Sequence, residues 1–241
     1  MKARKEKFKE GKEKFKTKHG VFDEFTNRTI FKLISEGHFK GLESPIFVGK
    51  ESNVFSALTK EGKRIIVKIY RLETCDFNAM YNYIKDDPRY GNLKDKKRKV
   101  IFAWVQREYR NLMNAREAQV SVPIPITFAN NVLVLEFIGK NDEIAPRLKD
   151  EIPKNKKLFF DKIIDNIRKL YKANIVHADL SAFNILNFNE TPVFIDMSQA
   201  TTTRHPRAEE FLERDVKNIC NFFNKIGLRV NEESAMKKIK K

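Results

Sequence analysis

Two carboxylates and a carboxamide follow one another at short intervals in the last third of the sequence. Asp179 precedes Asn184 by five residues, and Asp196 follows Asn184 by twelve. Magnesium prefers hard oxygen ligands and commonly binds through one or two carboxylates together with the phosphates of a nucleotide. A carboxylate that holds no metal can accept the proton of an attacking hydroxyl group. The three side chains are therefore candidates for phosphoryl transfer, with Asp179 as the base and Asn184 and Asp196 as metal ligands.

The residues between the two candidate metal ligands predict a β-hairpin. Two apolar runs, 185–186 and 193–195, flank the turn-like stretch 187–192. Such a hairpin would place its two ends, and hence the two ligands, side by side. Asp and Asn are also common in ordinary turns, so the spacing alone leaves unrelated turn residues open. The His-Ala pair before Asp179 and the Ile before Asp196 favour the catalytic and metal-binding segment of a protein-kinase-like phosphotransferase.

A lysine and a glutamate in the first half of the chain complete this pattern. Residues 64–70 predict a strand that contains Lys68, and residues 101–113 begin a long amphipathic helix that contains Glu108. In kinases a lysine of the third strand pairs with the nucleotide phosphates and with a glutamate of the following helix. Taken singly, each residue could simply face solvent. The order of loop, lysine strand and glutamate helix favours the ion pair.

A tight loop precedes the lysine strand and is the candidate phosphate-binding loop. Residues 45–58 alternate in polarity and predict strand, loop, strand. The loop would fold over a triphosphate and offer backbone amides as donors. It has one glycine and is not a Walker loop. The candidate ATP-binding residues of this loop are Gly49, Lys50, Glu51, Ser52, Asn53 and Val54.

The apolar stretch 132–139 predicts a strand that runs into a glycine turn. In a kinase this strand would connect the two lobes, and backbone groups at Glu136 and Ile138 would bind the adenine edge of ATP. A plain core strand explains the apolar residues equally well but leaves Glu136 without a role. We therefore add these two residues to the candidate ATP site.

The remaining segments predict two further helices and several less ordered stretches. Apolar spacing predicts helices over 22–36 and 158–173. Residues 74–99 contain a proline, a glycine and a basic run, and we interpret them as a flexible insertion. Cys75 and Cys220 are isolated and lack metal-ligand spacing, which favours inert free thiols.

The net charge of +16 over 241 residues is concentrated in three clusters. Residues 2–18 carry nine Lys or Arg against three Glu, residues 89–99 carry six against one Asp, and four lysines lie among the last five residues. Such clusters attract polyanions, so we expect an RNA-rich partner, although a solvated surface is the alternative. No apolar stretch is long enough to cross a membrane and none resembles a signal peptide, so we expect a cytoplasmic protein without membrane contact.

At this point the sequence closely resembles the RIO family of atypical protein kinases, in its type-one branch. The resemblance covers residues 21 to about 227. It is carried by Val21-Phe-Asp-Glu-Phe-Thr, Gly49-Lys-Glu-Ser-Asn-Val-Phe, Val67-Lys-Ile-Tyr-Arg, Asp87-Pro-Arg-Tyr, residues 104–111, Val122-Pro-Ile-Pro, His177-Ala-Asp-Leu-Ser-Ala-Phe-Asn-Ile-Leu, Ile195-Asp-Met-Ser-Gln-Ala and His205-Pro.

The resemblance implies a small two-lobed α+β kinase fold, with an antiparallel N-lobe sheet plus helix and a truncated, mainly helical C-lobe. That C-lobe would lack the activation segment and peptide-binding helices. The implied division is a basic flexible arm (1–20), a RIO-specific helix (21–44), the N-lobe (45–137), the C-lobe (138–228) and a basic C-terminal tail (229–241).

The implied activity is that of a serine/threonine kinase or ATPase that uses ATP with Mg²⁺ or Mn²⁺. The resemblance assigns Asp179 as the base, Asn184 and Asp196 as metal ligands, and Asp196 as a carboxylate that could transiently hold phosphate. It also implies a role in maturation of the small ribosomal subunit, with precursor particles and rRNA as partners.

Two other functions stay open from the sequence. The first is an RNA-binding assembly factor whose nucleotide site is only structural; the complete set of candidate residues argues against such decay. The second is a small-molecule phosphotransferase of the aminoglycoside-kinase kind, which shares the His-x-Asp loop. An acidic pocket for a cationic substrate would be expected there, whereas this chain is strongly basic.

Overall fold

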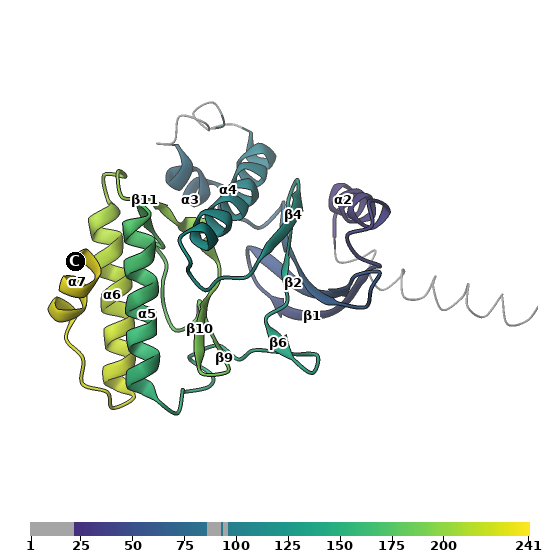
Figure 1. The fold of residues 1–241 in the computed structure, drawn as a ribbon. Helices are drawn as coiled ribbons and strands as arrows, with labels where there is room; N and C mark the ends of the chain where they lie inside the picture. The colour runs from purple at the N-terminus through teal and green to yellow at the C-terminus, as the bar shows by residue number, and fades with distance from the viewer. Residues whose placement is uncertain (1–21, 86–92, 94–95) are drawn as a thin grey trace, which may run out of the picture.

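The N-terminal half of the molecule is built around a five-stranded antiparallel sheet in the order β1-β2-β3-β5-β4 (Figure 1). The structure, a computed structural model, describes residues 22–85, 93 and 96–241. The expected basic arm, residues 1–20, lies outside this range. The strands are β1 (Leu42–Val48), β2 (Ser52–Leu58), β3 (Arg64–Tyr70), β4 (Pro125–Ala129) and β5 (Val132–Glu136).

The two faces of this sheet are covered by different helices because successive side chains of a strand point to opposite faces. Ile65, Val67 and Ile69 of β3 belong to an apolar cluster with α2 (Glu24–Ser35). Ile66 and Tyr70 belong to the cluster that includes α4 (Lys97–Glu117). Figure 1 shows α2 and α4 on opposite sides of the sheet. Lys68 shares the α4 face, and the register pairs it with Val54 and Leu133.

The C-terminal half is mainly helical. Its helices are α5 (Lys156–Lys172), α6 (Ala208–Lys225) and α7 (Glu232–Lys240), and its hairpin consists of β9 (Ile185–Phe188) and β10 (Thr191–Phe194). Short elements complete it: β6 (Gly139–Lys140), β7 (Glu143–Ile144), β8 (Ile175–Val176), β11 (Thr201–Thr202) and the 3₁₀ turn η2 (Met197–Gln199). Figure 1 shows α5 and α6 lying side by side with α7 against them.

Side-chain caps explain where several helices begin. Asp23 accepts a hydrogen bond from the Thr26 amide at the start of α2, and Asn155 accepts one from Leu158 at the start of α5. Such caps satisfy amides that have no partner within the helix. The α2 helix ends before Gly37, whose φ of 86° is a backbone conformation that favours glycine.

The interpretation of residues 74–99 as a flexible insertion was wrong for two of its parts. Residues Phe77–Ile84 form helix α3, because Asp76 caps it and because Met80 and Ile84 are buried in the core. The last part of the segment belongs to α4, which begins at Lys97 instead of residue 101. Residues 86–92 and 94–95 lie outside the described range.

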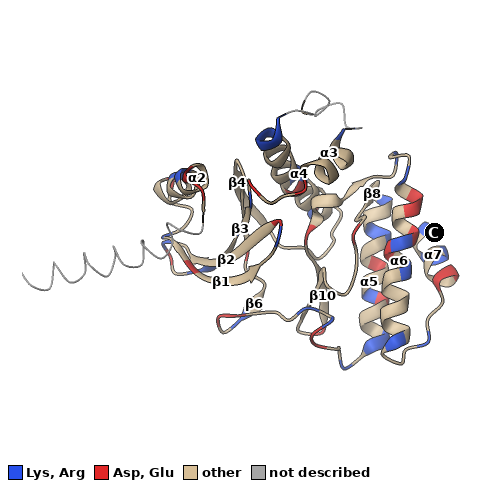
Figure 2. Cartoon of the chain, turned by 180° about the vertical axis from the view of Figure 1, so that it is seen from behind, with Lys and Arg blue, Asp and Glu red and all other residues tan. Residues whose placement is uncertain are grey.

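The basic C-terminal segment is also an ordered helix. Helix α7 buries Ala235 and Ile239 against the core, while its lysines face outward. Figure 2 shows positions of Lys and Arg, in blue, at the start of α4 and along α5, α6 and α7. Cys75 and Cys220 are both buried free thiols, as expected. Among the described residues, no helix has the length and apolar character that a membrane span requires.

Candidate active site

Lys68 is the centre of a buried polar cluster between the two halves of the molecule. Its Nζ donates to Oε1 of Glu108 at 2.8 Å and to Oδ1 of Asp196 at 3.0 Å. Glu108 comes from α4 and Asp196 follows β10, so the lysine joins three separate elements. The predicted ion pair between Lys68 and Glu108 is therefore present in the structure.

A tyrosine that the sequence reasoning missed completes this cluster. The Tyr70 hydroxyl donates to Oε2 of Glu108 at 2.6 Å, and the Lys68 ammonium lies 5.0 Å from the centre of the Tyr70 ring. Both oxygens of Glu108 thus have a donor, as a buried carboxylate requires. The signal was available, because Tyr70 lies two residues after Lys68 and so on the same face of β3.

The cluster shifts the protonation equilibria of its members. Burial raises the pKa of Glu108, although Lys68 acts in the opposite direction. Burial lowers the pKa of Lys68, but the charges of Asp196 and Glu108 outweigh it and hold this pKa well above its ordinary value. The lysine therefore stays charged and can attract a phosphate.

Asp196 occupies a left-handed backbone conformation, with φ 60° and ψ 63°, directly after the β9–β10 hairpin. Its Oδ1 accepts hydrogen bonds from Lys68 and, at 2.7 Å, from the Ser198 hydroxyl. Burial would raise the pKa of Asp196, but the Lys68 charge and these hydrogen bonds lower it. The side chain is still 40% exposed, so an ionised carboxylate is accessible to solvent, and its Oδ2 has no hydrogen bond among the described residues.

Asp179 and Asn184 lie together on the loop between β8 and β9. The Asn184 amide group donates to Oδ2 of Asp179 at 3.0 Å and to the Asp179 carbonyl at 2.9 Å. The Asn184 carbonyl accepts from the amide of Ile195 at 3.0 Å, beside Asp196. Burial and the negative charge of Asp196 raise the pKa of Asp179. The predicted hairpin thus brings Asp179, Asn184 and Asp196 close together.

Two residues of α6 hold the loop that carries Asp179. The buried carboxylate of Asp215 accepts from the amides of Ala178 and Leu180, both at 2.8 Å, and Arg214 donates to the Ala178 carbonyl. These contacts stabilise Ala178 at φ 66°, a conformation that is costly for a residue with a Cβ atom. Burial raises the pKa of Asp215 to about 7, against the two amide hydrogen bonds. The sequence signal was an aspartate on the apolar face of α6.

His177 supports the other side of the same loop. Burial lowers its pKa to about 4, so the ring is neutral at physiological pH. Its Nε2 lies 3.2 Å from the Ile195 carbonyl, which can only accept a hydrogen bond, so Nε2 carries the proton. His177 therefore links the Asp179 loop to the strand end that precedes Asp196.

The candidate phosphate-binding loop joins β1 to β2, and β2 pairs with the strand that carries Lys68. Burial raises the pKa of Glu51, and the negative charge of Asp196 acts in the same direction. The Glu51 carbonyl accepts from the Arg71 amide, and the Lys50 carbonyl accepts from the Thr74 hydroxyl. At Gly49 a Cβ atom would lie 2.6 Å from the Phe47 ring and 3.1 Å from the Ser52 carbonyl oxygen, so a side chain there would displace the ring.

The remaining residues of the candidate phosphate-binding loop differ in which of their groups can contact ATP. Val54 pairs with Lys68 in the register and shares its face of the sheet. Asn53 therefore points to the opposite face, and its Oδ1 is buried with no hydrogen-bond partner among the described residues. Only the backbone of Asn53 is suited to an ATP contact. The Ser52 carbonyl accepts from the Gly49 amide at 3.0 Å and closes the turn.

The candidate adenine contacts lie where β5 leaves the sheet. The Glu136 amide donates to the Ile124 carbonyl, and its carboxylate accepts from the Ile124 amide at 3.0 Å. The side chain thus has a structural role that the sequence did not suggest. The Ile138 carbonyl accepts from Ala145. What these positions can offer an adenine is accordingly the Glu136 carbonyl and the Ile138 amide.

The donor set fits a magnesium ion that also binds phosphate oxygens. Because the Asn184 nitrogen is engaged by Asp179, the Asn184 side-chain oxygen is the atom left for a metal. Because Oδ1 of Asp196 is engaged by Lys68 and Ser198, Oδ2 is left. Within the described ranges there is no group of three His, Cys, Asp or Glu side chains placed to hold a metal. Two oxygen ligands plus phosphates match what Mg²⁺ accepts.

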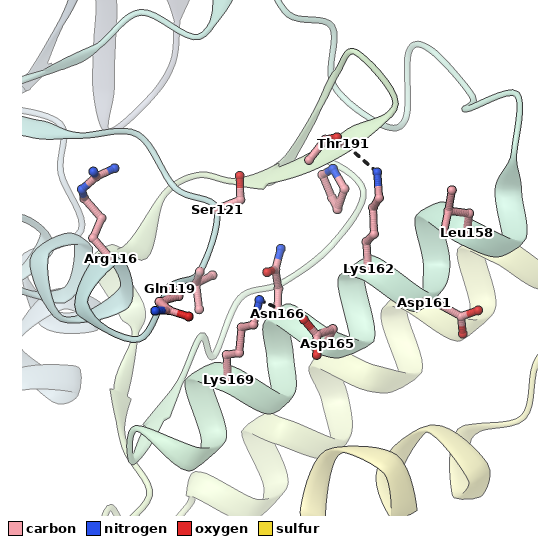
Figure 3. Close-up of a pocket in the computed structure, with 12 residues that line it drawn as sticks. Arg116, Gln119, Ser121, Leu158, Asp161, Lys162, Asp165, Asn166, Lys169 and Thr191 are labelled. Carbon is pink, nitrogen blue, oxygen red and sulfur yellow. Dashed lines mark hydrogen bonds and ion pairs between the residues drawn. The ribbon is translucent and has the colours of Figure 1, made fainter.

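A cavity of about 650 Å³ lies elsewhere, between α5, β10 and the residues after α4 (Figure 3). Lys169, Asp165 and Lys162 line it, and their charged groups are engaged within the protein. Lys169 pairs with Asp165 at 2.9 Å, and Lys162 donates to the Thr191 hydroxyl and the Glu190 carbonyl. The cavity contains none of the candidate catalytic residues, so its size does not mark the catalytic site.

Comparison with known proteins agrees with this geometry. The model of the RIO domain family matches residues 53–236. The chain is 40% identical over 222 residues to the RIO-type serine/threonine-protein kinase Rio1 of Haloferax volcanii, covering 92% of this chain and 77% of that protein. It is 41% identical over 229 residues to Rio1 of Methanocaldococcus jannaschii, covering 94% and 78%. Human RIO1 is 35% identical over 215 residues, covering 87% of this chain and 38% of the human protein.

Solved structures give the same fold. The Rio2 kinase of Chaetomium thermophilum, in a complex described as ADP/Mg²⁺-phosphoaspartate, matches with a TM-score of 0.68 at 24% identity, covering 87% of this chain and 65% of that one. The structure thus has a small α+β protein-kinase-like fold. The chain belongs to the RIO family and is a RIO-type serine/threonine-protein kinase. The expected family and fold are confirmed.

Proposed function

We propose that this chain transfers phosphate from ATP with Mg²⁺, or Mn²⁺ in its place, using Asp179 as the general base. The observation that carries the proposal is the contact between Lys68 and Asp196, at 3.0 Å across 128 residues of sequence. It brings a cation suited to phosphates beside a carboxylate suited to the metal. The relatives are named as serine/threonine kinases, which supports the same chemistry.

Each residue would have a distinct task. Lys68, fixed by Glu108, would bind the phosphates, and the backbone of residues 49–54 would donate to them. Bound magnesium would neutralise charge on the phosphates, held by the side-chain oxygens of Asn184 and Asp196. Asp179 would accept the proton of the attacking hydroxyl, and its raised pKa makes it a better base than an ordinary aspartate.

We further propose that Asp196 can itself accept the phosphoryl group when no hydroxyl acceptor is bound. The Rio2 complex is described as containing a phosphoaspartate. An oxygen of Asp196 would attack the γ-phosphorus while the bond to ADP breaks, and water would later cleave the acyl phosphate and release inorganic phosphate. Net ATP hydrolysis would result, so kinase and ATPase activities would share one site.

The test of the proposed chemistry is Asp179→Asn in the full chain. This variant should bind ATP with Mg²⁺ as tightly as the unmodified protein, because Asp179 is not assigned to the metal. Transfer to a serine acceptor should fall at least about a hundredfold, the scale of losing a general base. Asp161→Asn, a partly exposed aspartate of α5 paired with Lys157, is the matched control. Unchanged transfer by Asp179→Asn would remove Asp179 from the mechanism.

The partner we propose is a precursor of the small ribosomal subunit, bound through rRNA in the cytoplasm. The support is electrostatic: the net charge is +16, and Lys96, Lys97, Arg98 and Lys99 are exposed together at the start of α4. Phosphate contacts release counterions, so affinity should fall steeply with salt.

The measurement is the affinity for small-subunit rRNA between about 50 and 200 mM salt, a range over which several phosphate contacts cost orders of magnitude in affinity. Replacing Lys96, Lys97 and Lys99 with Gln should flatten the salt dependence. The matched control is the same change at Lys60, Lys63 and Lys85, which lie outside this cluster. Equal binding at low and high salt would contradict the proposed partner.

A further inference from the structure

Two phenylalanines are exposed close to the candidate catalytic residues. Phe183 directly precedes Asn184 and is 57% exposed, and Phe47, at the end of β1, is 43% exposed. A single exposed apolar side chain is common and needs no explanation. The positions of Phe183 and Phe47 do need an explanation, because Phe183 lies on the Asp179 loop and Phe47 contacts Gly49 of the candidate phosphate-binding loop.

The two rings are held by cations from one short segment. The Lys149 ammonium lies 5.0 Å from the centre of the Phe183 ring, and the Arg147 guanidinium lies 4.9 Å from that of Phe47. Residues 147 and 149 are two apart, so this segment ties the end of β1 to the Asp179 loop. Cation–aromatic contacts at exposed sites are modest in energy but fix geometry.

The segment is itself anchored to the catalytic loop by its backbone. The Leu148 amide donates to the Ile185 carbonyl at 2.8 Å, and the Lys149 amide donates to the Ala182 carbonyl at 3.1 Å. Arg147 also forms a β-bridge with Leu186. The rings and cations are thus positioned by the same hairpin that positions Asn184 and Asp196.

We infer that Phe183, Phe47, Lys149 and Arg147 form the surface that binds the protein segment around the acceptor hydroxyl. This inference rests on the proposed function, because it takes Asp179 as the base. A base must lie within about 3 Å of the hydroxyl it deprotonates, and successive residues of an extended peptide are about 3.3 Å apart. Asn184, which directly follows Phe183, donates to Oδ2 of Asp179 at 3.0 Å, so the residue next to the acceptor would lie within reach of Phe183.

The chemistry of this surface defines the acceptor class. An exposed ring favours an aromatic or large apolar residue beside the acceptor serine or threonine. Among the described residues, Arg147 has no carboxylate partner, and the one carboxylate that pairs with Lys149 is that of its neighbour Asp150, at 2.8 Å. The surface thus favours acidic residues in the flanks and disfavours basic ones. An apolar-flanked, acidic segment is the acceptor we assign.

The experiment uses the full chain with ATP and Mg²⁺ and three synthetic serine peptides. The first has Phe next to the serine and Glu in both flanks, the second replaces that Phe with Ala, and the third replaces the Glu residues with Lys. We expect the first peptide to have about a tenfold higher kcat/KM than the second, the scale of an aromatic contact with its buried area. We expect the third to be the poorest substrate.

Phe183→Ala should reduce the ratio of kcat/KM between the first two peptides to about one. This ratio is measured within one variant, so a general loss of activity or folding does not change it. The matched control is Phe31→Ala, since Phe31 is 65% exposed on α2, and this variant should keep the tenfold ratio. Arg147→Glu should narrow or reverse the preference for the first peptide over the third.

Several outcomes would overturn the assignment. One is an equal kcat/KM for the first two peptides in the unmodified protein. Another is a tenfold ratio of kcat/KM between these peptides that remains in Phe183→Ala. ATP hydrolysis without transfer to any peptide would also overturn it while leaving the proposed ATP site intact. A further outcome is that single-stranded oligouridine competes with the first peptide and binds with an affinity that depends on Phe183. That result would mean that the surface stacks on RNA bases instead of binding an acceptor peptide. Absence of both hydrolysis and transfer would instead contradict the proposed function.

Discussion

The two halves of the candidate site are built in opposite ways. On the N-terminal side, Lys68, Tyr70 and Glu108 are buried, and every charged atom of Glu108 has a donor. On the C-terminal side, Asp179 and Asp196 are partly exposed, and each acts through its negative charge to raise the pKa of other carboxyls nearby. The first half is electrostatically complete without ligand, whereas the second half carries an excess of negative charge.

This difference indicates which half of the candidate site is stabilised by a bound ligand. A buried, fully hydrogen-bonded ion pair is rigid, and it loses much stability when one partner is removed. Partly exposed carboxylates that repel one another are stabilised when a divalent cation arrives. We therefore expect substitutions in the Lys68 cluster to damage stability and substitutions in the Asp179 loop to damage activity only.

The largest expected effect on stability is that of Glu108→Gln. Lys68 would keep its charge but lose its fully buried carboxylate partner, and the free energy of unfolding should fall by about 3 kcal/mol. Chemical denaturation at pH 7 measures it. The matched control is Glu117→Gln on the same helix, where the side chain is exposed, and this should change stability by less than about 0.5 kcal/mol. Equal effects of the two variants would contradict the comparison.

Tyr70→Phe should have the next largest effect. It removes one hydrogen-bond donor from Oε2 of Glu108 and should cost about 2 kcal/mol, the scale of leaving a buried charged acceptor unsatisfied. It should also raise the KM for ATP, because Glu108 orients Lys68. The control is Tyr109→Phe, whose ring packs 4.9 Å from that of Phe128 and whose hydroxyl is not required for this packing. If the Tyr70 variant keeps both stability and KM, the tyrosine has no positioning role.

The smallest expected effect has the opposite sign. The pKa of Asp179 is raised in the folded state, chiefly by burial and then by Asp196, so ionisation of this residue destabilises the metal-free protein as pH rises above about 4. Asp179→Asn removes this cost and should stabilise the metal-free protein at pH 7 by at most about 1 kcal/mol, since solvent screens the site. The gain should shrink as the pH falls toward 4, below which both side chains are neutral.

Denaturation in the presence of a chelator, at pH 7 and near pH 4, makes this measurement. The contrasting control is Asp165→Asn, because hydrogen bonding to Lys169 and Arg168 lowers the pKa of Asp165. That variant should lose stability at pH 7, if it changes at all. A similar fall in the free energy of unfolding in Asp179→Asn would contradict the view that the charge of Asp179 destabilises the metal-free protein.

The sequence predicted most of the local structure and the core of the site. Alternating polarity over residues 45–58 identified β1 and β2, and the apolar runs on both sides of a turn identified the β9–β10 hairpin. These patterns are local, because they depend on residues two to four apart. The spacing of Asp179, Asn184 and Asp196 predicted that they lie close together for the same reason, because the length of a hairpin determines how its two ends meet.

Other features could not be obtained from local patterns. Helix α3 was missed because its stability comes from burying Met80 and Ile84 against α4, which is a tertiary contact. The structural role of Glu136 depends on the backbone of Ile124, in the segment that leads into a neighbouring strand. Asp215 holds the Asp179 loop through the Leu180 amide, which is 35 residues away in the sequence. In each case the partner is distant in sequence.

By itself, the sequence indicated which residues are candidates for the chemistry, since candidate oxygen ligands, a candidate base and a lysine appear at spacings that hairpin and strand geometry converts into proximity. Only the tertiary structure decided how each charge is balanced: which oxygen of Asp196 stays free, that Tyr70 completes Glu108, and that Arg147 and Lys149 cover two exposed rings. The physical reason is that charge balance depends on burial and on donors brought from distant segments. Neither quantity is encoded in the spacing of neighbouring residues.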